Sequence, residues 1–360
     1  MNYKIDFNSK KPIYLQLYEQ VRKDIIDGVY PYKSKLPSKR VVESELGISV
    51  ITIEHAYGLL AEEGYIESKE RSGYIVIFRS GDGFAYPVEN FEKKRLLTHS
   101  DREQFPFSVL TKTMRRVIND YSESILEKSP NTGLQQLRNA ISGYLARSRG
   151  VHVSSDRIVV GSGAEYLYGM IVGLLGENLV YGIESPSYEK IEKVYIANRV
   201  QIDRLVLDSS GIKSEELKRT KADVLHVSPY RSFPTGITAS ASKRHEYLRW
   251  AGKNRYIVED DFESEFSVSK KAEETIFALS NSDNVIYMNT FTKTVSPAIR
   301  VGYMVLPQKL VDDFHKKLGV YSCTVPTFEQ LVLAELLDIG DFERHINLER
   351  PRMRKELQNR

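Results

Sequence analysis

The sequence predicts an α/β protein of two domains: a small N-terminal domain of helices closed by a hairpin, and a larger domain with a mainly parallel sheet covered by helices on both faces. Two observations support this prediction. The chain has 360 residues, which is long for one domain and enough to bury a sizeable core. After Thr111, helical stretches alternate with short β-rich runs, an order typical of an open parallel sheet.

Composition sets the class of protein before any motif is considered. The single cysteine, Cys323, excludes an internal disulfide framework and fits a reducing cytoplasm. No apolar run reaches the length of a membrane span, and the start MNYKIDFNSKK lacks the apolar stretch of a signal peptide. We therefore expect a cytoplasmic protein with no membrane partner. The net charge is only +3, so DNA binding has to be argued from local pattern.

Three helical segments and two short strands are expected within the first 79 residues. Residues 11–28 carry an apolar side chain at every fourth position from Ile13, as in a helix with one buried face. Ser38 and Ser49 are each placed to cap a following helix. These helices are expected to run to Leu46 and Gly64. The stretch YIESKERSGYIVIF then predicts two strands joined by a turn.

This order of elements is that of a winged helix-turn-helix domain, whose last helix enters the major groove of double-stranded DNA. In that helix we expect Ile53, Ala56 and Leu60 to face the core, with Ile51 and Leu59 flanking them. Short polar and basic side chains near helix starts suit contacts with DNA phosphates. A small helical domain without nucleic acid has the same pattern and stays an alternative. The predicted DNA contacts are Lys39, Arg40, Ser49, Thr52, His55, Arg71 and Gly73.

Between residues 80 and 105 the periodicity fades. The turn-rich stretch SGDGFAYP is followed there by the charge run EKKR. We predict a linker over residues 80–105, with the DNA-binding domain at residues 1–79 and the second domain at residues 106–360.

In open α/β sheets, ligands bind at the carboxyl ends of the strands, so the residues that follow each β-rich run are the candidates for a site. After RIVV, the turn GSGA at residues 161–164 opens a helix and offers backbone N–H groups to a phosphate; a plain tight turn fits equally well. After RYIV, the acids EDD at residues 259–261 can hold a metal, act as a base or pair with a protonated ring nitrogen; a solvated acidic loop is the alternative.

The strand end after NVIYM is more specific. Lys293 lies in a hydroxyl-rich turn, and Arg300 follows seven residues later. A lysine amine can form a Schiff base with an aldehyde, while hydroxyls and an arginine fork bind phosphate. Lys293 alone would more often be a surface lysine. Together with the other two strand ends, it describes a pyridoxal phosphate (PLP) site with no metal.

Over nearly its whole length the chain resembles the MocR-type regulators, a branch of the GntR family that carries an aminotransferase-like domain of fold type I. PIYLQLYEQVRKDIIDG, LPSKR, LGIS and RSGYIV resemble the GntR winged-helix signature. SPNTGLQQLRNAISGYLARSRGV, FPTG, VEDDFESEF and YMNTFTKTVSPAIRVGYMVLP follow in the family's order. The resemblance implies a homodimeric transcription regulator that senses PLP or an amine or amino-acid effector. An aminotransferase with an accessory DNA-binding domain is one alternative, and a degenerate chain with neither activity is another.

The resemblance also implies roles for individual residues. Lys293 matches the lysine that forms the Schiff base with PLP, and Asp260 matches the carboxylate paired with the pyridine nitrogen. Two threonines and an arginine match the phosphate ligands, helped by the backbone of the glycine turn, and a tyrosine lies near the cofactor. The residues in the implied cofactor site are Gly163, Ala164, Tyr188, Asp260, Thr290, Thr292, Lys293 and Arg300.

Several positions depart from the family pattern. Phe262 stands where relatives carry a tyrosine, Phe233 replaces the asparagine of aminotransferases, YRS at residues 230–232 replaces Ser-His-Gln, and Val50 replaces an arginine of the DNA-contacting helix. Each change removes a polar contact. The first three lead us to expect no net turnover, and Val50 weakens one expected contact with DNA. The chain stops at Arg360, where relatives continue into a small C-terminal domain. We expect the second domain to be truncated there and its effector pocket to be incomplete.

Overall fold

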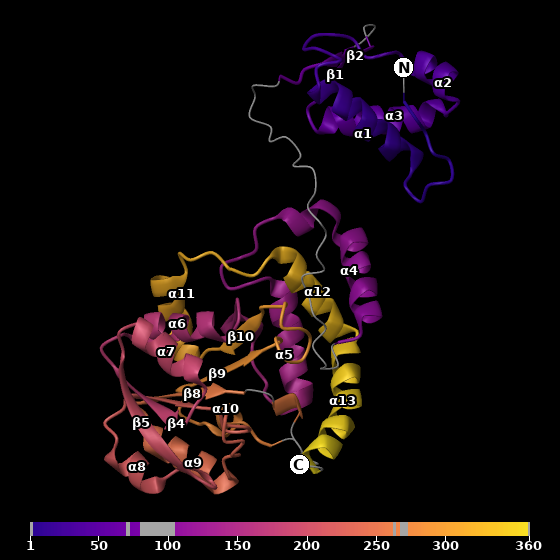
Figure 1. Ribbon diagram of the computed structural model, residues 1–360. Helices are drawn as coiled ribbons and strands as arrows, with labels where there is room; N and C mark the ends of the chain where they lie inside the picture. Colours follow the sequence, from indigo (N-terminus) through magenta and orange to yellow (C-terminus); the bar gives the residue numbers. More distant parts are fainter. Residues whose placement is uncertain (1–2, 70–72, 80–104, 262–263, 267–272, 359–360) are drawn as a thin grey trace. The chain divides into compact units, whose positions relative to one another are not determined.

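The computed structural model describes residues 3–69, 73–79, 105–261, 264–266 and 273–358, with side chains as far as residue 352. The chain divides into two compact units, residues 1–99 and 100–360 (Figure 1). The predicted linker at residues 80–105 lies almost wholly outside the described residues, so its bounds stay a prediction. Among the described helices, none is both long enough and apolar enough to span a membrane.

The N-terminal unit has the element order that the sequence predicts. Three helices precede a two-stranded antiparallel hairpin in which Ile66 pairs with Val76. The hydroxyls of Ser38 and Ser49 accept hydrogen bonds from the backbone N–H groups of Val41 and Thr52, which confirms both as helix caps. The elements are α1 (Ile13–Ile26), α2 (Lys39–Leu46), α3 (Val50–Glu62), β1 (Ile66–Lys69) and β2 (Gly73–Val76).

The core of this unit lies between α1, α3 and the hairpin. Ile53, Ala56 and Leu60 of α3 are fully buried, as predicted, and Leu59 packs at the edge of the core. The prediction for Ile51 is wrong, because this side chain is 77% exposed. The physical reason is the helical period, which places Ile51 about 200° from Ile53 and therefore across the helix from the core.

The larger unit is built on an eight-stranded sheet with the order β3-β10-β9-β8-β7-β4-β5-β6. Strand β10 is antiparallel to both of its neighbours, and the short edge strand β6 is antiparallel to β5. The other neighbouring pairs are parallel, which confirms the mainly parallel sheet. The β-rich runs expected after Thr111 form strands, and the short strand β6 was not expected. The strands are β3 (Ile158–Gly161), β4 (Val180–Ser185), β5 (Gln201–Asp208), β6 (Gly211–Ile212), β7 (Val224–Val227), β8 (Tyr256–Asp260), β9 (Val285–Thr290) and β10 (Gly302–Val305).

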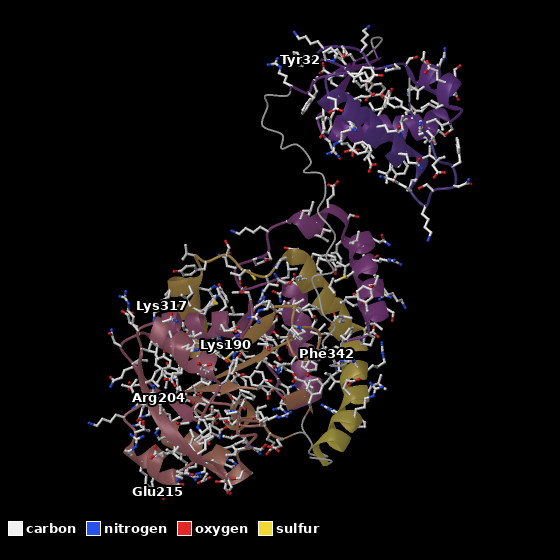
Figure 2. All side chains as sticks on the ribbon, in the orientation of Figure 1. Tyr32, Lys190, Arg204, Glu215, Lys317 and Phe342 are labelled. Carbon is white, nitrogen blue, oxygen red and sulfur yellow. The ribbon has the colours of Figure 1, made fainter. Side chains whose placement is uncertain are left out.

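Helices cover both faces of this sheet, and alternate residues of each strand contact opposite layers. Val159 and Met304 pack with α6, α7 and α11, whereas Val160 and Tyr303 pack with α5 and α12. Figure 2 shows Phe342 inside the unit, where it is buried. The helices are α4 (Phe107–Tyr121), α5 (Gln135–Arg149), α6 (Ala164–Leu175), α7 (Glu189–Ala197), α8 (Ser214–Arg219), α9 (Ala241–Ala251), α10 (Ile276–Leu279), α11 (Gln308–Leu318), α12 (Thr327–Asp338) and α13 (Asp341–Gln358).

Candidate functional site

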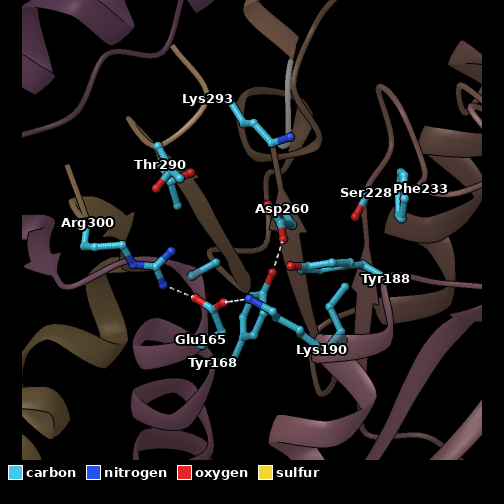
Figure 3. A pocket seen from close by; sticks show the side chains of 13 residues that line it. Glu165, Tyr168, Tyr188, Lys190, Ser228, Phe233, Asp260, Thr290, Lys293 and Arg300 are labelled. Carbon is cyan, nitrogen blue, oxygen red and sulfur yellow. Dashed lines mark hydrogen bonds and ion pairs between the residues drawn. The ribbon is translucent and has the colours of Figure 1, made fainter. Parts of the chain in front are cut away.

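A pocket opens at the carboxyl ends of the parallel strands β3, β4, β7, β8 and β9 (Figure 3). This is the edge at which open α/β sheets bind ligands. Seven of the eight residues predicted for the cofactor site line this pocket, and Gly163 lies in the turn beside it. The seven are Ala164, Tyr188, Asp260, Thr290, Thr292, Lys293 and Arg300.

The turn between β3 and α6 brings the backbone of Gly163 next to the side chain of Arg300. Gly163 has φ +92° and ψ 178°, a conformation open essentially only to glycine. A Cβ atom at Gly163 would lie 3.1 Å from Nη2 of Arg300, so the guanidinium rests against the turn. The first N–H groups of α6 and this guanidinium together offer several donors to an anion. The glycine turn predicted from the sequence is therefore a cradle with a cation beside it.

Arg300 and Lys190 share one carboxylate in this cradle. Oε2 of Glu165 lies 2.6 Å from Nη2 of Arg300, and Oε1 lies 2.6 Å from Nζ of Lys190. Burial alone would raise the pKa of Glu165, but the hydrogen bonds from Lys190 and Arg300 outweigh it and lower the pKa to about 2. Glu165 is therefore ionised at neutral pH, and it places a negative charge in the cradle.

Asp260 is held by a chain of buried side chains behind the pocket. Its Oδ2 accepts a hydrogen bond of 2.6 Å from the Tyr168 hydroxyl and lies 3.6 Å from Nε2 of His226. The other ring nitrogen of His226 is hydrogen-bonded to the Tyr195 hydroxyl at 2.6 Å. All four side chains are buried. A carboxylate fixed in this way can receive a protonated nitrogen from a ligand without rearranging.

The acids on either side of Asp260 do not face the pocket. Glu259 is fully buried, accepts a hydrogen bond of 2.5 Å from the Tyr230 hydroxyl, and has its pKa raised to about 7 by burial. Asp261 is also fully buried and forms an ion pair of 3.0 Å with Arg149. The alternative of a solvated acidic loop is therefore wrong at residues 259–261. The alternation of a β-strand sends Asp260 to the pocket and its neighbours into the core.

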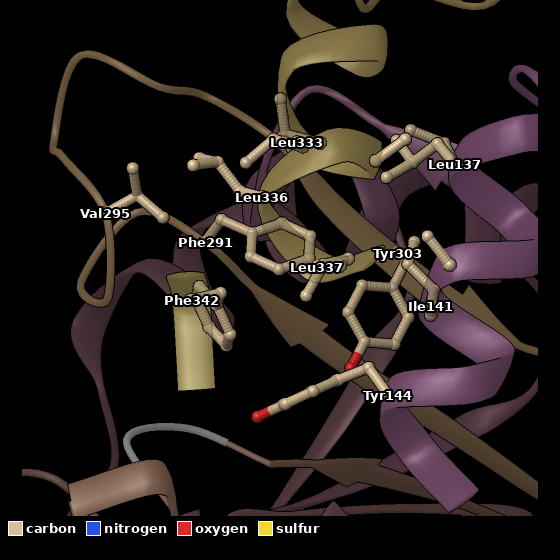
Figure 4. Close-up of a cluster of buried hydrophobic side chains, with 14 of the residues drawn as sticks. Leu137, Ile141, Tyr144, Phe291, Val295, Tyr303, Leu333, Leu336, Leu337 and Phe342 are labelled. Atoms are coloured by element: carbon tan, nitrogen blue, oxygen red, sulfur yellow. The ribbon is translucent and has the colours of Figure 1, made fainter. Parts of the chain in front are cut away.

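Buried apolar side chains anchor the loop that carries Lys293. Phe291 and Val295, two residues to either side of Lys293, are 2% and 3% exposed and pack in the core that α5 and α12 share (Figure 4). Lys293 itself is exposed and lines the pocket. The core thus fixes the backbone on both sides of the lysine.

Aromatic rings form another wall of the pocket. Tyr188 and Phe233 meet edge to face, with ring centroids 5.9 Å apart and planes at 82°. Phe233 is 54% exposed, at the position where aminotransferases carry an asparagine. Phe262, another departure from the family pattern, lies outside the described residues.

Apart from Phe233, which the sequence marked only as a departure from the family, five side chains that line the pocket were not assigned from the sequence: Glu165, Tyr168, Lys190, Ile191 and Ser228. Ser228 directly follows β7, so the strand-end rule would have found it had it been applied to that strand. Tyr168 lies one helical turn after Ala164 and so faces the same way, which is a weaker signal. No local signal marks His226 as a neighbour of Asp260.

Six of the seven predicted DNA contacts lie within the described part of the N-terminal unit, and most of these are accessible. Lys39 is half-buried and ion-paired with Glu54 of α3. His55 is exposed and stacks on Tyr14, with ring centroids 4.2 Å apart and planes at 19°. Thr52 is half-buried, and Arg71 lies outside the described residues. The remaining exposed members of the set are Arg40, Ser49 and Gly73.

Comparisons with known proteins agree with this division. Residues 13–76 match the bacterial regulatory proteins of the gntR family, and residues 98–360 match the aminotransferases of class I and II. The chain is 33% identical to the HTH-type transcriptional regulator YdeL of Bacillus subtilis, covering 96% of this chain and 77% of that protein. It is 26% identical to the probable rhizopine catabolism regulatory protein MocR of Rhizobium meliloti, covering 95% and 75%.

A solved structure shows the same relationship for the larger unit. Kynurenine aminotransferase of Pyrococcus horikoshii superimposes with a TM-score of 0.63 at 27% identity, covering 70% of this chain and 64% of that one. The chain thus spans about three quarters of the two regulators and slightly less than two thirds of the aminotransferase. The protein belongs to the MocR-type regulators of the GntR family, which join a winged helix-turn-helix domain to an aminotransferase-like domain of fold type I.

Proposed function

We propose that the protein is a homodimeric, cytoplasmic DNA-binding transcription regulator whose aminotransferase-like domain binds PLP at Lys293. Occupancy of this site by PLP, or by an amine or amino-acid effector joined to it, changes the affinity of the protein for DNA. One observation supports this proposal above the others: Lys293, Asp260 and Arg300 line the same pocket in a chain that also carries a GntR unit.

The residues of the pocket fit PLP in their chemistry. The cradle at Gly163, with Arg300 against it and the hydroxyls of Thr290 and Thr292 on the pocket wall, suits a phosphate dianion. The buried carboxylate of Asp260 suits a protonated pyridine nitrogen. The Lys293 amine suits an aldehyde carbon. When bound, PLP supplies an aldehyde that condenses with primary amines, and this chemistry gives the site its class of effector.

Ligand binding can shift DNA affinity only if the ligand binds two conformations of the protein unequally. The side chains around the pocket belong to α6 and α7, to the ends of β8 and β9, and to the loops that follow β4, β7 and β9, so a ligand there contacts much of the sheet edge. We infer that PLP and its amine adducts contact this edge differently, and that the difference drives the response.

An absorption spectrum tests the cofactor site. Purified protein with PLP is expected to show a visible band that borohydride abolishes, because reduction fixes the lysine–cofactor link. Lys293→Ala should lose the band. Lys190→Met is the matched control, since it removes another lysine that lines the same pocket and should keep the band. A band that persists in Lys293→Ala would contradict the proposal.

A mobility shift with the DNA upstream of the protein's own gene tests regulation. We expect a sequence-specific shift whose midpoint changes when PLP or a PLP–amine mixture is added. Absence of any specific shift in all conditions would refute the regulator. Repeated conversion of an added amino acid to its keto acid would instead favour the aminotransferase alternative.

A further inference from the structure

The first turn of α3 carries an exposed apolar side chain. Ile51 is 77% exposed, the highest value among the large apolar side chains described in the N-terminal unit. Single exposed apolar residues are common on protein surfaces and mean little by themselves. Ile51, however, lies on the helix that follows the turn of a helix-turn-helix, and side chains at the start of this helix contact base edges.

The helical period places Ile51 on the outward face of α3. Ile53 is fully buried two residues later, which corresponds to a rotation of about 200° around the helix axis. His55 lies four residues after Ile51 and so shares its face. His55 is exposed as well, with its ring stacked on Tyr14. The face that α3 turns away from its core therefore begins with an isoleucine.

The polar side chains around Ile51 already have partners within the protein. The Ser49 hydroxyl accepts a hydrogen bond of 3.2 Å from the Thr52 N–H and lies 2.9 Å from the Thr52 hydroxyl. Glu54 is ion-paired with Lys39 of α2. Val50, next to Ile51, is half-buried and apolar. The start of α3 thus presents one strongly exposed apolar side chain, Ile51, where hydrogen-bonding side chains would read a guanine or an adenine.

In the major groove only one base carries an apolar group on its edge, the 5-methyl group of thymine. We infer that Ile51 recognises a thymine methyl group, so that apolar contact sets the sequence preference of this regulator at the base facing the first turn of α3. This inference rests on the proposed function, because it requires that the N-terminal unit bind duplex DNA.

The test uses the full chain and DNA selected from a random duplex library. Each thymine of the selected sequence is then replaced in turn by deoxyuridine, which removes only the methyl group. At one position per half-site, the wild-type protein is expected to bind about three- to fivefold more weakly, the effect of returning one methyl group to water. Replacing the same base by 5-methylcytosine, paired with guanine, should retain more affinity than cytosine does.

Ile51→Ala supplies the second arm of the experiment. This variant should bind the thymine and deoxyuridine duplexes equally, because the contact is already lost, and its thermal unfolding should match that of the wild type since Ile51 is exposed. Val29→Ala is the matched control, an apolar residue 62% exposed between α1 and α2, and should keep the full methyl effect.

The outcomes separate the inference from the function on which it rests. Selected sequences with no methyl-sensitive thymine, or a methyl effect that persists in Ile51→Ala, would overturn the inference while leaving DNA recognition intact. Failure of the wild-type protein to select any sequence would overturn the proposed function, and the inference with it.

Discussion

Asp260 differs from its two acidic neighbours in its surroundings rather than in its chemistry. It shares a pocket with Lys293 and accepts a hydrogen bond from Tyr168, whereas Glu259 and Asp261 are bonded within the core. Strand alternation explains the split, because adjacent side chains point to opposite faces of a sheet. Of the three consecutive acidic residues, one is therefore a candidate to bind a ligand, and the other two are structural residues of the core.

Glu165 is the residue whose change should most directly alter cofactor affinity. Its carboxylate pairs with Arg300, which we propose as a phosphate ligand, so the phosphate of PLP has to share that cation. Glu165→Gln should tighten PLP binding by up to about fivefold, because an exposed ion pair is worth up to about 1 kcal/mol. The measurement is a PLP titration followed by absorbance.

The control for this substitution is Glu189→Gln, which removes an exposed carboxylate of α7 that pairs with Lys193. Its PLP affinity should equal that of the wild type. Weaker binding by Glu165→Gln would indicate that the carboxylate orients Arg300 for the phosphate instead of competing with it.

At the scale of elements, the turn from β3 into α6 sets the geometry of the proposed phosphate site. Gly163→Ala should lower the free energy of unfolding by about 1–3 kcal/mol, because the conformation at φ +92° and ψ 178° is open essentially only to glycine. The new Cβ atom would also press on Arg300, at 3.1 Å from its Nη2 atom. Urea unfolding measures the stability, and the same samples should bind PLP more weakly.

Gly169→Ala is the matched substitution in the same helix. Gly169 lies in the interior of α6, and a Cβ atom there would meet its nearest neighbour at 3.8 Å, an ordinary contact. Alanine at this position should therefore stabilise the protein by up to about 1 kcal/mol. Equal changes in the free energy of unfolding for the two substitutions would show that the backbone at position 163 does not require glycine.

At the level of the whole protein, the unit that contains the eight-stranded sheet buries the carboxyl groups of three glutamates. Burial raises the pKa values of Glu184, Glu259 and Glu265 to about 7 each. Each of these groups is easier to protonate in the folded protein than in the unfolded chain, where an ordinary glutamate titrates near 4.5. The fold therefore favours the neutral form of these side chains.

Stability should consequently fall as pH rises from 6 to 8. The contribution of each raised carboxyl is fully present below the unfolded pKa and is lost as pH rises through the folded pKa of about 7. This interval should lower the free energy of unfolding by about 1 kcal/mol per group. Urea unfolding at the two pH values measures the change, and Glu259→Gln should reduce it because the amide does not titrate.

Glu215→Gln is the control for this pH dependence, because Glu215 is an exposed residue of α8 (Figure 2). It should show the same fall in stability between pH 6 and 8 as the wild type. A fall of the same size in Glu259→Gln would exclude Glu259 as a source of the pH dependence.

Local patterns predicted the order of elements in the N-terminal unit and the alternation of helices and strands in the larger unit, and the family resemblance implied seven residues of the pocket. Helix caps at Ser38 and Ser49, the four-residue period of α1 and the β-rich runs are local signals, and local signals survive without tertiary contacts. The strand ends of the pocket followed from a topological rule, since Asp260 and Lys293 come at the ends of parallel strands, whereas the resemblance to the MocR-type regulators implied the individual residues, Tyr188 among them.

The partners of these side chains are seen only in the folded protein. Tyr168 reaches Asp260 across 92 residues of sequence, and Glu165 reaches Arg300 across 135. No local pattern encodes such pairs, because periodicity tells which face of an element is buried but not which residue of another element it meets.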